Sequence, residues 1–316
     1  MDLTSFFTEN RGELLALLSG FFFAFGTATI SLGTVRKRGD NGALLTVIAT
    51  LVISALIWAI MGSDISVFTS QDTVLRGLFW FSLSGLLATV FGRMFLFKSI
   101  QNLGVSRAAT IKRLNPFFTS IIAVVILGEV LTPTTGSGMG LIAISILILV
   151  RGTLKSWSDP DALPSHHGTE TRSAMAFAYG PISALSYAFS YVGRRYGVDN
   201  INDGAFGTFV SSVAALLFYL IGAIFVKDYR RAFVEAFTNV NRWQLTTAIF
   251  ISFGQISTFS AIQYTDVSRV VLIQSMEIFI SMFLSVAILK TETKIDAITI
   301  FAGVLATVGV ALIILA

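Results

Sequence analysis

Residues 91–127 read FGRMFLFKSIQNLGVSRAATIKRLNPFFTSIIAVVIL, and residues 253–289 read FGQISTFSAIQYTDVSRVVLIQSMEIFISMFLSVAIL. The two stretches align without a gap when position 91 is set on position 253. The triplet Val-Ser-Arg at 105–107 recurs at 267–269, and Gln101 recurs as Gln263. Shared apolar composition would not reproduce these polar positions, so the alignment indicates an internal duplication. A weaker match, in a slightly different register, relates 19–33 to 183–197.

The composition indicates that lipid rather than water surrounds most of the chain. Hydrophobic residues make up 54% of the 316 residues and charged residues 13%, and the mean hydropathy is +0.78. Soluble domains carry about 25% charged residues. The chain has no cysteine, which excludes disulfides, thiol catalysis and cysteine-ligated metals. The basic residues behind the net charge of +4 are scattered and form no patch, so we expect no nucleic-acid partner.

The apolar runs predict an all-α integral membrane protein with ten transmembrane helices. A helix needs about 20 largely apolar residues to cross the hydrocarbon core, and helices satisfy their own backbone groups in lipid. The ten predicted spans are roughly 12–33, 42–61, 75–98, 104–127, 135–151, 173–192, 205–226, 243–264, 267–289 and 295–315. Each repeat then contains five helices, and because five is odd the two repeats must be inverted relative to each other. Inverted repeats suit alternating access to a site near the membrane midplane.

The longest polar break divides the chain near its middle. We predict a first five-helix repeat at 1–152, a linker at 153–172 and a second five-helix repeat at 173–316. The linker is rich in Ser, Asp and Pro and contains His166 and His167. Two adjacent histidines without a third ligand favour a solvated loop over a metal site, and we expect neither a metal nor a cofactor. No phosphate-cradling Gly-Lys-Ser pattern is present, which gives no support to direct use of ATP.

The stretch LGVSRAATIKRLNPFFTSIIAVVILGEVLTP at 103–133 resembles the repeat signature of the drug/metabolite transporter superfamily, in its ten-helix EamA-like branch. There a helix start of small residues leads to a mid-helix proline, an apolar run and a Gly-Glu turn. The glycines of the fifth and tenth predicted spans are also similar to that family: Gly136, Gly138, Gly140, Gly303 and Gly309. The resemblance covers essentially the whole chain. It implies transport of small molecules and places residues of the first and sixth helices at a central cavity.

Four charged side chains fall well inside predicted spans: Arg93, Lys112, Arg113 and Glu277. A charge at the centre of a membrane helix costs about 2.5–3.5 kcal/mol on insertion scales, so such a side chain is expected to face a cavity or a partner. Arg93 lies towards one end of its span, where its long side chain can reach the interface. We therefore assign Arg93 to the surroundings of the cavity, and the other three to the cavity itself.

Two polar stripes occupy equivalent helix faces in the two repeats. The side chains of each stripe are spaced i, i+3 and i+7: Lys112, Asn115 and Thr119 on the fourth span, and Gln274, Glu277 and Ser281 on the ninth. Residues at this spacing share one helix face. We predict that both stripes line one cavity, and that Pro116 kinks the fourth helix because proline removes a backbone hydrogen bond.

The buried charges admit three interpretations. Glu277 pairs with Lys112 or Arg113 and locks the halves together, or the two basic residues bind a carboxylate or phosphate of the substrate. In the third interpretation Glu277 carries a proton, because burial favours the neutral form of a carboxylate and lets it load and release. The second and third are compatible with each other.

Two tyrosines of the sixth span form a further candidate pair. Tyr187 and Tyr191 are four residues apart and share a helix face. Ordinary packing, or an interfacial position for Tyr191, is the alternative to a role in the cavity.

The loop charges and the family resemblance predict opposite orientations. Five basic residues, Arg194 and Arg195 among them, are assigned to the side that carries the termini, and 14 to the opposite side. The positive-inside rule then places both termini outside, whereas the resemblance implies cytoplasmic termini. Both orientations stay open at this point.

These inferences predict a secondary active transporter of a small polar or amphipathic metabolite, working by alternating access, with proton coupling or exchange. It would be a multi-pass protein of a bacterial or archaeal cytoplasmic membrane, acting as a monomer or homodimer. Its expected partners are the metabolite, the lipid bilayer and protons. The alternatives are an integral membrane enzyme that modifies lipids and a non-catalytic membrane scaffold.

Overall fold

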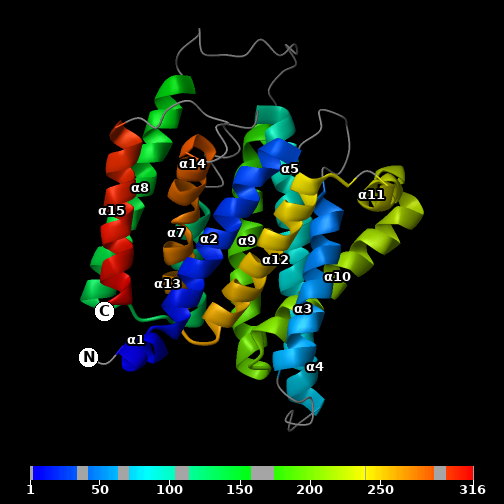
Figure 1. Ribbon diagram of the computed structural model, residues 1–316, viewed down its shortest axis with the longest axis horizontal. Helices are drawn as coiled ribbons and strands as arrows, with labels where there is room; N and C mark the ends of the chain where they lie inside the picture. Colours follow the sequence, from blue (N-terminus) through cyan, green and yellow to red (C-terminus); the bar gives the residue numbers. More distant parts are fainter. Residues whose placement is uncertain are drawn as a thin grey trace.

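Apolar sequence forms helix throughout the described part of the chain (Figure 1). The computed structural model describes residues 3–33, 42–62, 71–103, 114–157, 174–238, 240–287 and 297–315. The helices of the first half are α1 (Leu3–Glu9), α2 (Arg11–Gly33), α3 (Ala43–Met61), α4 (Gln71–Gly85), α5 (Arg93–Leu103), α7 (Asn115–Ile122) and α8 (Pro133–Trp157). Those of the second half are α9 (Ala174–Asn200), α10 (Gly204–Phe225), α11 (Lys227–Thr238), α12 (Arg242–Ile262), α13 (Val267–Gln274), α14 (Glu277–Ala287) and α15 (Ala297–Ile314).

Among the described residues, eight helical segments are long and apolar enough to cross a membrane. They are Arg11–Thr29, Ala43–Met61, Gln71–Leu96, Pro133–Arg151, Gly204–Phe225, Arg242–Ile262, Val267–Leu284 and Ala297–Ile314. The fourth and sixth predicted spans correspond to the short α7 with its continuation and to α9. The prediction of an all-helical membrane protein is confirmed, and the number of ten crossings stays a prediction.

The two halves interlock rather than standing apart. Helix α12 packs along α2, α10 along α3, and α9 along α4, so each contact joins one half to the other. Buried hydroxyl pairs link these helices: Ser19 with Thr258 at 2.7 Å, Thr29 with Thr247 at 2.8 Å and Thr50 with Ser252 at 2.9 Å. Small polar residues are the usual means of bringing membrane helices close together. The chain ends both lie at the same end of the bundle (Figure 1).

A glycine contact joins α8 to α15 at the side of the bundle. A Cβ atom at Gly138 would lie 2.6 Å from the carbonyl oxygen of Gly309, and one at Gly309 would lie 2.7 Å from that of Gly138. Only glycine permits such a close backbone approach. A Cβ at Gly136 or Gly140 would meet nothing within 4 Å. Of the predicted glycine pattern, Gly138 and Gly309 therefore form the crossing point.

Three of the predicted spans are not continuous α-helix. The third contains a π-helical segment, Leu86–Gly92, between α4 and α5. The ninth is interrupted at Ser275 and Met276, where backbone bonds shift to i→i+3 spacing between α13 and α14. In the fourth, α7 begins at Asn115, with Pro116 in its first turn, and continues as the π-helical segment Ala123–Leu127. Proline is tolerated in a first turn because the N–H that it lacks has no partner there.

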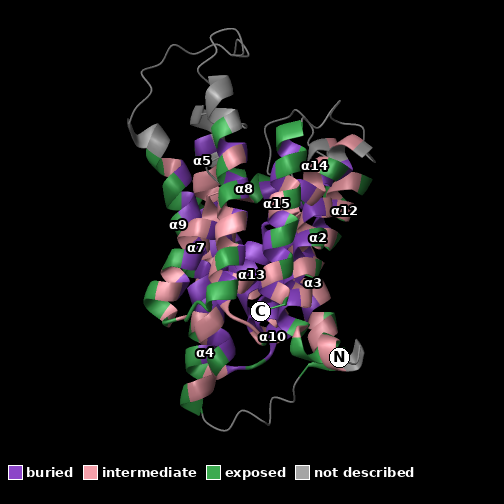
Figure 2. Cartoon of the chain, turned by 90° about the vertical axis from the view of Figure 1, so that its left-hand side faces the viewer, coloured by how far each residue is buried: buried purple, intermediate pink, exposed green. Residues whose placement is uncertain are grey.

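Figure 2 shows how buried and exposed residues are distributed over the bundle. Many large hydrophobic residues are exposed, and many serines and threonines are buried. Ile60 and Phe225 are 80% and 81% exposed, whereas Ser54 and Ser190 are fully buried. This distribution suits a protein surrounded by lipid. Helix α8 extends to Trp157, beyond the predicted end of the first repeat, and residues 158–173, with His166 and His167, lie outside the described residues. The division into repeats and linker stays a prediction.

Helix α11 was not anticipated from the sequence. It follows α10 directly and carries five charged residues. Its buried alanines, Ala232 and Ala236, pack in one cluster with residues of α3 and α10. From its position at the edge of the bundle (Figure 1), it covers part of α10 and also contacts α3 of the first half.

Candidate functional site

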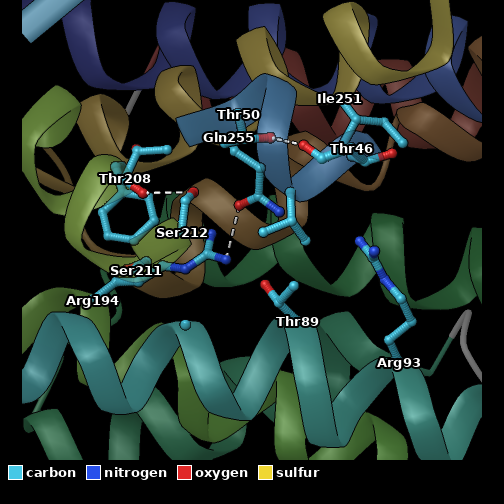
Figure 3. Close-up of a pocket in the computed structure, with 13 residues that line it drawn as sticks. Thr46, Thr50, Thr89, Arg93, Arg194, Thr208, Ser211, Ser212, Ile251 and Gln255 are labelled. Carbon is cyan, nitrogen blue, oxygen red and sulfur yellow. Dashed lines mark hydrogen bonds between the residues drawn. The ribbon is translucent and has the colours of Figure 1, made fainter. Parts of the chain in front are cut away.

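A polar cavity lies between α3 and the α4–α5 segment of the first half and α9, α10 and α12 of the second half (Figure 3). In this conformation it is narrow and leaves about 20 Å³ free, about the space of one water molecule. Its lining is rich in hydroxyl groups and contains two arginines. The lining residues are Thr46, Val47, Thr50, Gly85, Thr89, Arg93, Arg194, Thr208, Ser211, Ser212, Ile251, Gln255 and Phe259.

Arg194 is the most deeply buried charge of the cavity. It lies in α9 and is 5% exposed. Its guanidinium carbon is 4.8 Å from the ring centroid of Tyr191 and 4.6 Å from that of Phe259. Nη2 donates a hydrogen bond to Oε1 of Gln255 at 3.0 Å, while the buried Nε has no hydrogen-bond partner. Among the described residues, no carboxylate lies within ion-pair distance of Arg194.

The prediction that placed Arg194 in a loop is therefore wrong. The sixth span was predicted to end at residue 192, before Arg194 and Arg195, but α9 continues to Asn200. The helix tolerates Arg194 because two aromatic faces and an amide oxygen surround its guanidinium group. Arg194 must also be removed from the loop charges used to predict orientation, which leaves four of the five on the terminal side.

Arg93 lies at the other end of the cavity, as the first residue of α5. Nη1 donates a hydrogen bond to the backbone oxygen of Ala43 at 3.0 Å, and the side chain is half-buried. Figure 3 shows Arg194 directed towards Gln255 and Arg93 on the far side of Thr89. Arg93 thus lines the cavity directly, whereas the sequence predicted a position in the surroundings of the cavity.

The hydroxyl groups of the cavity bind mostly to backbone carbonyls of their own helices. Thr50 donates to the oxygen of Thr46 at 2.7 Å, and Ser212 to that of Thr208 at 2.9 Å. Ser211 instead donates to Phe81 in α4, at 2.8 Å. Since a hydroxyl that donates in this way keeps its lone pairs, these groups can accept hydrogen bonds from a solute.

The repeat relates several of these residues in pairs. The register that sets position 91 on position 253 also places Thr46 on Thr208, Thr50 on Ser212, and Arg93 on Gln255. In the same register DNGALLTVIAT at 40–50 lies on NDGAFGTFVSS at 202–212, with Gly-Ala and a threonine in common. This second match could have been found in the sequence, and it would have identified the hydroxyl positions of the cavity.

A chain of buried hydrogen bonds connects the cavity to the interrupted ninth span. The hydroxyl of Tyr191 donates to Oε1 of Gln274 at 2.8 Å, and Nε2 of Gln274 donates to Thr258 at 3.4 Å. Thr258 shares a 2.7 Å hydrogen bond with Ser19 of α2. The structure therefore brings together two residues predicted from the sequence, Tyr191 and Gln274, and joins Tyr191 to Arg194 through its ring.

None of the described residues of the two predicted stripes, Gln274 included, is part of the cavity lining. Glu277 begins α14 and accepts a hydrogen bond from Thr27 of α2 at 2.9 Å. Thr119 donates to the backbone oxygen of Asn115 at 2.9 Å, and Ser281 to that of Ile278 at 3.0 Å. Helices α7 and α13 are in contact, so Asn115 and Thr119 lie on a helix next to that of Gln274, whereas Glu277 and Ser281 lie on α14. A cavity shared by both stripes stays a prediction.

Three further predicted residues complete the comparison. Lys112 and Arg113 lie outside the described residues. Tyr187 is half-buried beside Gly92, where a Cβ atom would come within 3.0 Å of its ring. Tyr187 therefore packs next to the segment that carries Arg93.

Comparisons with known proteins agree with this architecture. The family model described as the EamA-like transporter family matches residues 10–151 and 174–315, one match in each half. The chain is 27% identical over 140 residues to the "Uncharacterized transporter YwfM" of Bacillus subtilis (strain 168), a match over 44% of this chain. The matched region spans 45% of that relative's length.

A solved crystal structure supports the fold over almost the whole chain. It matches with a TM-score of 0.67 and 15% sequence identity, covering 97% of this chain and 98% of the other. At that identity the likeness concerns the fold alone. With two family matches, and with eight apolar helices of membrane-spanning length among the described residues, the chain is a multi-pass integral membrane protein, and it belongs to the EamA-like transporter family, within the drug/metabolite transporter superfamily.

Proposed function

We propose that this chain is a secondary active transporter that moves a small polar or amphipathic metabolite by alternating access. The carrying observation is that the polar cavity is lined by both halves, in part by residues that the repeat relates. A solute bound there contacts α3 and α5 on one side and α9, α10 and α12 on the other. Rocking one half against the other would therefore change the access to that solute from either side of the membrane.

The interrupted helices support the same mechanism. The π-helical segment Leu86–Gly92 lies directly before Arg93, and the interruption at Ser275–Met276 directly follows Gln274. Irregular backbone inside a membrane protein is tolerated where it lines a cavity or is buried in protein. Such segments give the two halves places at which to bend without breaking the long helices on either side.

Glu277 is the proposed site of proton coupling. It lies at the start of α14 and binds Thr27 of the other half. Protonation would remove its charge and convert it from an acceptor of the Thr27 hydroxyl into a group that can also donate. This change acts at a contact between the halves, which is where a coupling residue can alter their relative positions.

Flux through liposomes tests the proposal. The full chain would be reconstituted and offered labelled amino acids, nucleosides, organic anions and cationic drugs, with and without an imposed proton gradient. We expect one class to enter faster than into protein-free liposomes and to exchange faster when the same solute is inside. If no class moves faster through liposomes that contain monodisperse protein, the transport proposal is wrong.

The variant Glu277→Gln separates coupling from transport. Glutamine keeps the oxygen that accepts from Thr27 but cannot carry a proton. We expect it to lose accumulation driven by the gradient while keeping exchange at equal concentrations. Glu235→Gln is the matched control, because Glu235 lies in α11 at the edge of the bundle. Normal accumulation by Glu277→Gln would refute the coupling role.

A lipid-modifying enzyme is the alternative that the cavity makes less suitable. Such an enzyme needs a nucleophile with a base, or a metal site, near the membrane interface. The described lining of the cavity contains hydroxyls and arginines but no Asp, Glu or His. Incubation with labelled phospholipids and analysis of the lipid products would detect such an activity directly.

A further inference from the structure

The most informative feature of the cavity is a buried positive charge that the protein does not neutralise. Arg194 is 5% exposed, and its Nε has no hydrogen-bond partner. A buried arginine normally pairs with a carboxylate, because an isolated charge is costly in a low dielectric. The cation–π contacts to Tyr191 and Phe259 offset part of this cost, but they leave Nε of the guanidinium edge without a hydrogen-bond partner.

The surroundings hold that edge in a fixed orientation. The rings of Tyr191 and Phe259 restrict the guanidinium group, and Gln255 holds Nη2. Tyr191 is itself fixed by its hydrogen bond to Gln274. A group positioned in this way loses little conformational entropy when it binds a ligand. Arginine presents five N–H donors in a planar fork that matches the oxygens of carboxylates and phosphates.

The rest of the lining adds a second positive charge. The described hydrogen bond of Arg93 is to the neutral backbone oxygen of Ala43, and no described carboxylate lies within ion-pair distance of it. The described lining thus carries two positive charges and no negative one. This balance attracts anions and offers no carboxylate to pair with an ammonium group.

The hydroxyl groups give a second element of recognition. Thr50 and Ser212 donate to backbone oxygens and so present lone pairs to the cavity. Hydrogen-bond donors of a ligand, such as its own hydroxyl groups, can bind to them. In this conformation the cavity leaves only about 20 Å³ free, little more than one water molecule requires, so binding of such an anion requires the halves to move apart.

We infer that this cavity binds the carboxylate or phosphate group of a small, hydroxyl-bearing anion, with Arg194 as the principal anion-binding residue and Arg93 as the second. The inference rests on the proposed transport function and deepens it by naming the substrate class. It depends on the described residues of the cavity alone, and Lys112 and Arg113 have no part in it.

Ligand-dependent thermal stability of the purified full chain tests the inference. The probes are acetate and inorganic phosphate as minimal head groups, glycerate and glycerol 3-phosphate as hydroxyl-bearing anions, and glycerol and choline as neutral and cationic controls. A ligand that binds the folded state raises its melting temperature in a saturable manner. We expect the hydroxyl-bearing anions to bind and the controls not to bind. Comparing the affinities for glycerate and glycerol 3-phosphate then shows whether the site prefers a carboxylate or a phosphate group.

Variants assign the binding to Arg194. We expect Arg194→Gln to weaken the binding of the preferred anion by roughly tenfold or more, because a charge-assisted bond to the ligand is lost. Arg93→Gln should weaken it by a smaller factor. Arg195→Gln is the matched control: it removes the same charge from the next position of α9, where Arg195 pairs with Asp199 at 3.0 Å, and it should leave affinity unchanged.

The possible outcomes separate the inference from the transport proposal. If no anion binds, if choline or glycerol binds as well as the anions, or if Arg195→Gln weakens binding as much as Arg194→Gln, the anion site is refuted. If Arg194→Gln does not fold, Arg93→Gln carries the same test. Saturable anion binding without flux in liposomes would refute the transport proposal and leave the anion site intact. Flux restricted to cations or neutral solutes would refute the anion site and leave the transport proposal intact.

Discussion

Arg194 and Arg269 are two arginines at contacts between the halves, and their surroundings differ in charge. Nη1 of Arg269 lies 3.4 Å from Oε1 of Glu13, which is itself buried and accepts a 2.6 Å hydrogen bond from Thr265. Arg194 has aromatic rings and an amide around it and no described carboxylate. A paired charge holds structure together, while a buried charge without a carboxylate is available to an anionic ligand.

Glu129 adds a second carboxylate contact between the halves, next to the pair of Arg269 and Glu13. Its carboxylate accepts hydrogen bonds from the backbone N–H groups of Val267 and Ser268, at 2.7 and 3.0 Å. These are the first N–H groups of α13, so Glu129 of the first half caps a helix of the second half. Gly128, with φ of 68°, provides the left-handed turn that directs Glu129 to this position. The first turn of α13 is thus held by the carboxylates of Glu129 and Glu13. Its other end, at Gln274, belongs to the hydrogen-bond chain that leads through Tyr191 to the cavity.

The largest expected effect comes from giving Arg194 the carboxylate that it lacks. In Gln255→Glu the new carboxylate would occupy the position of the amide oxygen that lies 3.0 Å from Nη2. We expect the affinity for the preferred anion to fall by roughly hundredfold, because a like charge beside the ligand costs several kcal/mol. Titration by calorimetry measures this loss.

Two further measurements make that experiment decisive. The unliganded Gln255→Glu protein should melt no lower than the wild type, since its buried cation becomes paired. Gln263→Glu is the control, because Gln263 follows α12 and binds Asn202 rather than an arginine. Undiminished anion binding by Gln255→Glu would show that the unpaired charge of Arg194 is not what recognises the ligand.

The next effect concerns the acid that caps α13. Glu129→Ala leaves the N–H groups of Val267 and Ser268, two buried residues, without their partner. We expect a loss of about 2 kcal/mol, in the range of lost helix caps, with anion affinity unchanged. Thermal melting in detergent reports the stability, and Glu235→Ala on α11, which breaks an exposed i,i+4 pair, should change it by less than about 0.5 kcal/mol.

The sequence predicted those features of the fold and of the cavity that depend on residues close together along the chain. Apolar run lengths and the repeat predicted the helical fold, because both are local or periodic properties of the chain. Tyr191 and Gln274 were found because their types and positions marked polar faces inside spans. Arg194 was missed because the side chains that make its burial tolerable, Phe259 and Gln255, lie on α12, far from it along the chain.

The prediction of the two polar stripes contains a different error, which concerns the path of the backbone. Helical periodicity placed Gln274, Glu277 and Ser281 on one face because it assumed one continuous helix. The interruption at Ser275–Met276 ends α13 at Gln274 and begins α14 at Glu277. A change in backbone bonding of this kind depends on tertiary packing, so periodicity alone does not predict that Gln274 faces Tyr191 while Glu277 faces Thr27.

A smaller effect is expected from the pair that holds the other arginine. Glu13→Gln keeps the oxygen that accepts from Thr265 and removes the charge opposite Arg269. Arg269 is 21% exposed, so solvent screens the pair in part, and we expect a loss of about 1 kcal/mol. A double-mutant cycle with Arg269→Gln isolates the interaction. An interaction energy of zero would mean that the pair does not hold α2 to α13.

The smallest effect tests whether the cavity hydroxyls recognise the ligand or only join helices. Thr50→Val keeps the shape of the side chain but removes a hydroxyl that also pairs with Ser252 at 2.9 Å. We expect affinity for glycerate to fall about threefold, and affinity for acetate, which has no hydroxyl to donate, to stay the same. Ser54→Ala is the control, since Ser54 binds within α3 and lies outside the cavity lining. Equal losses for both anions would indicate that Thr50 positions helices, and that recognition depends on the arginines alone.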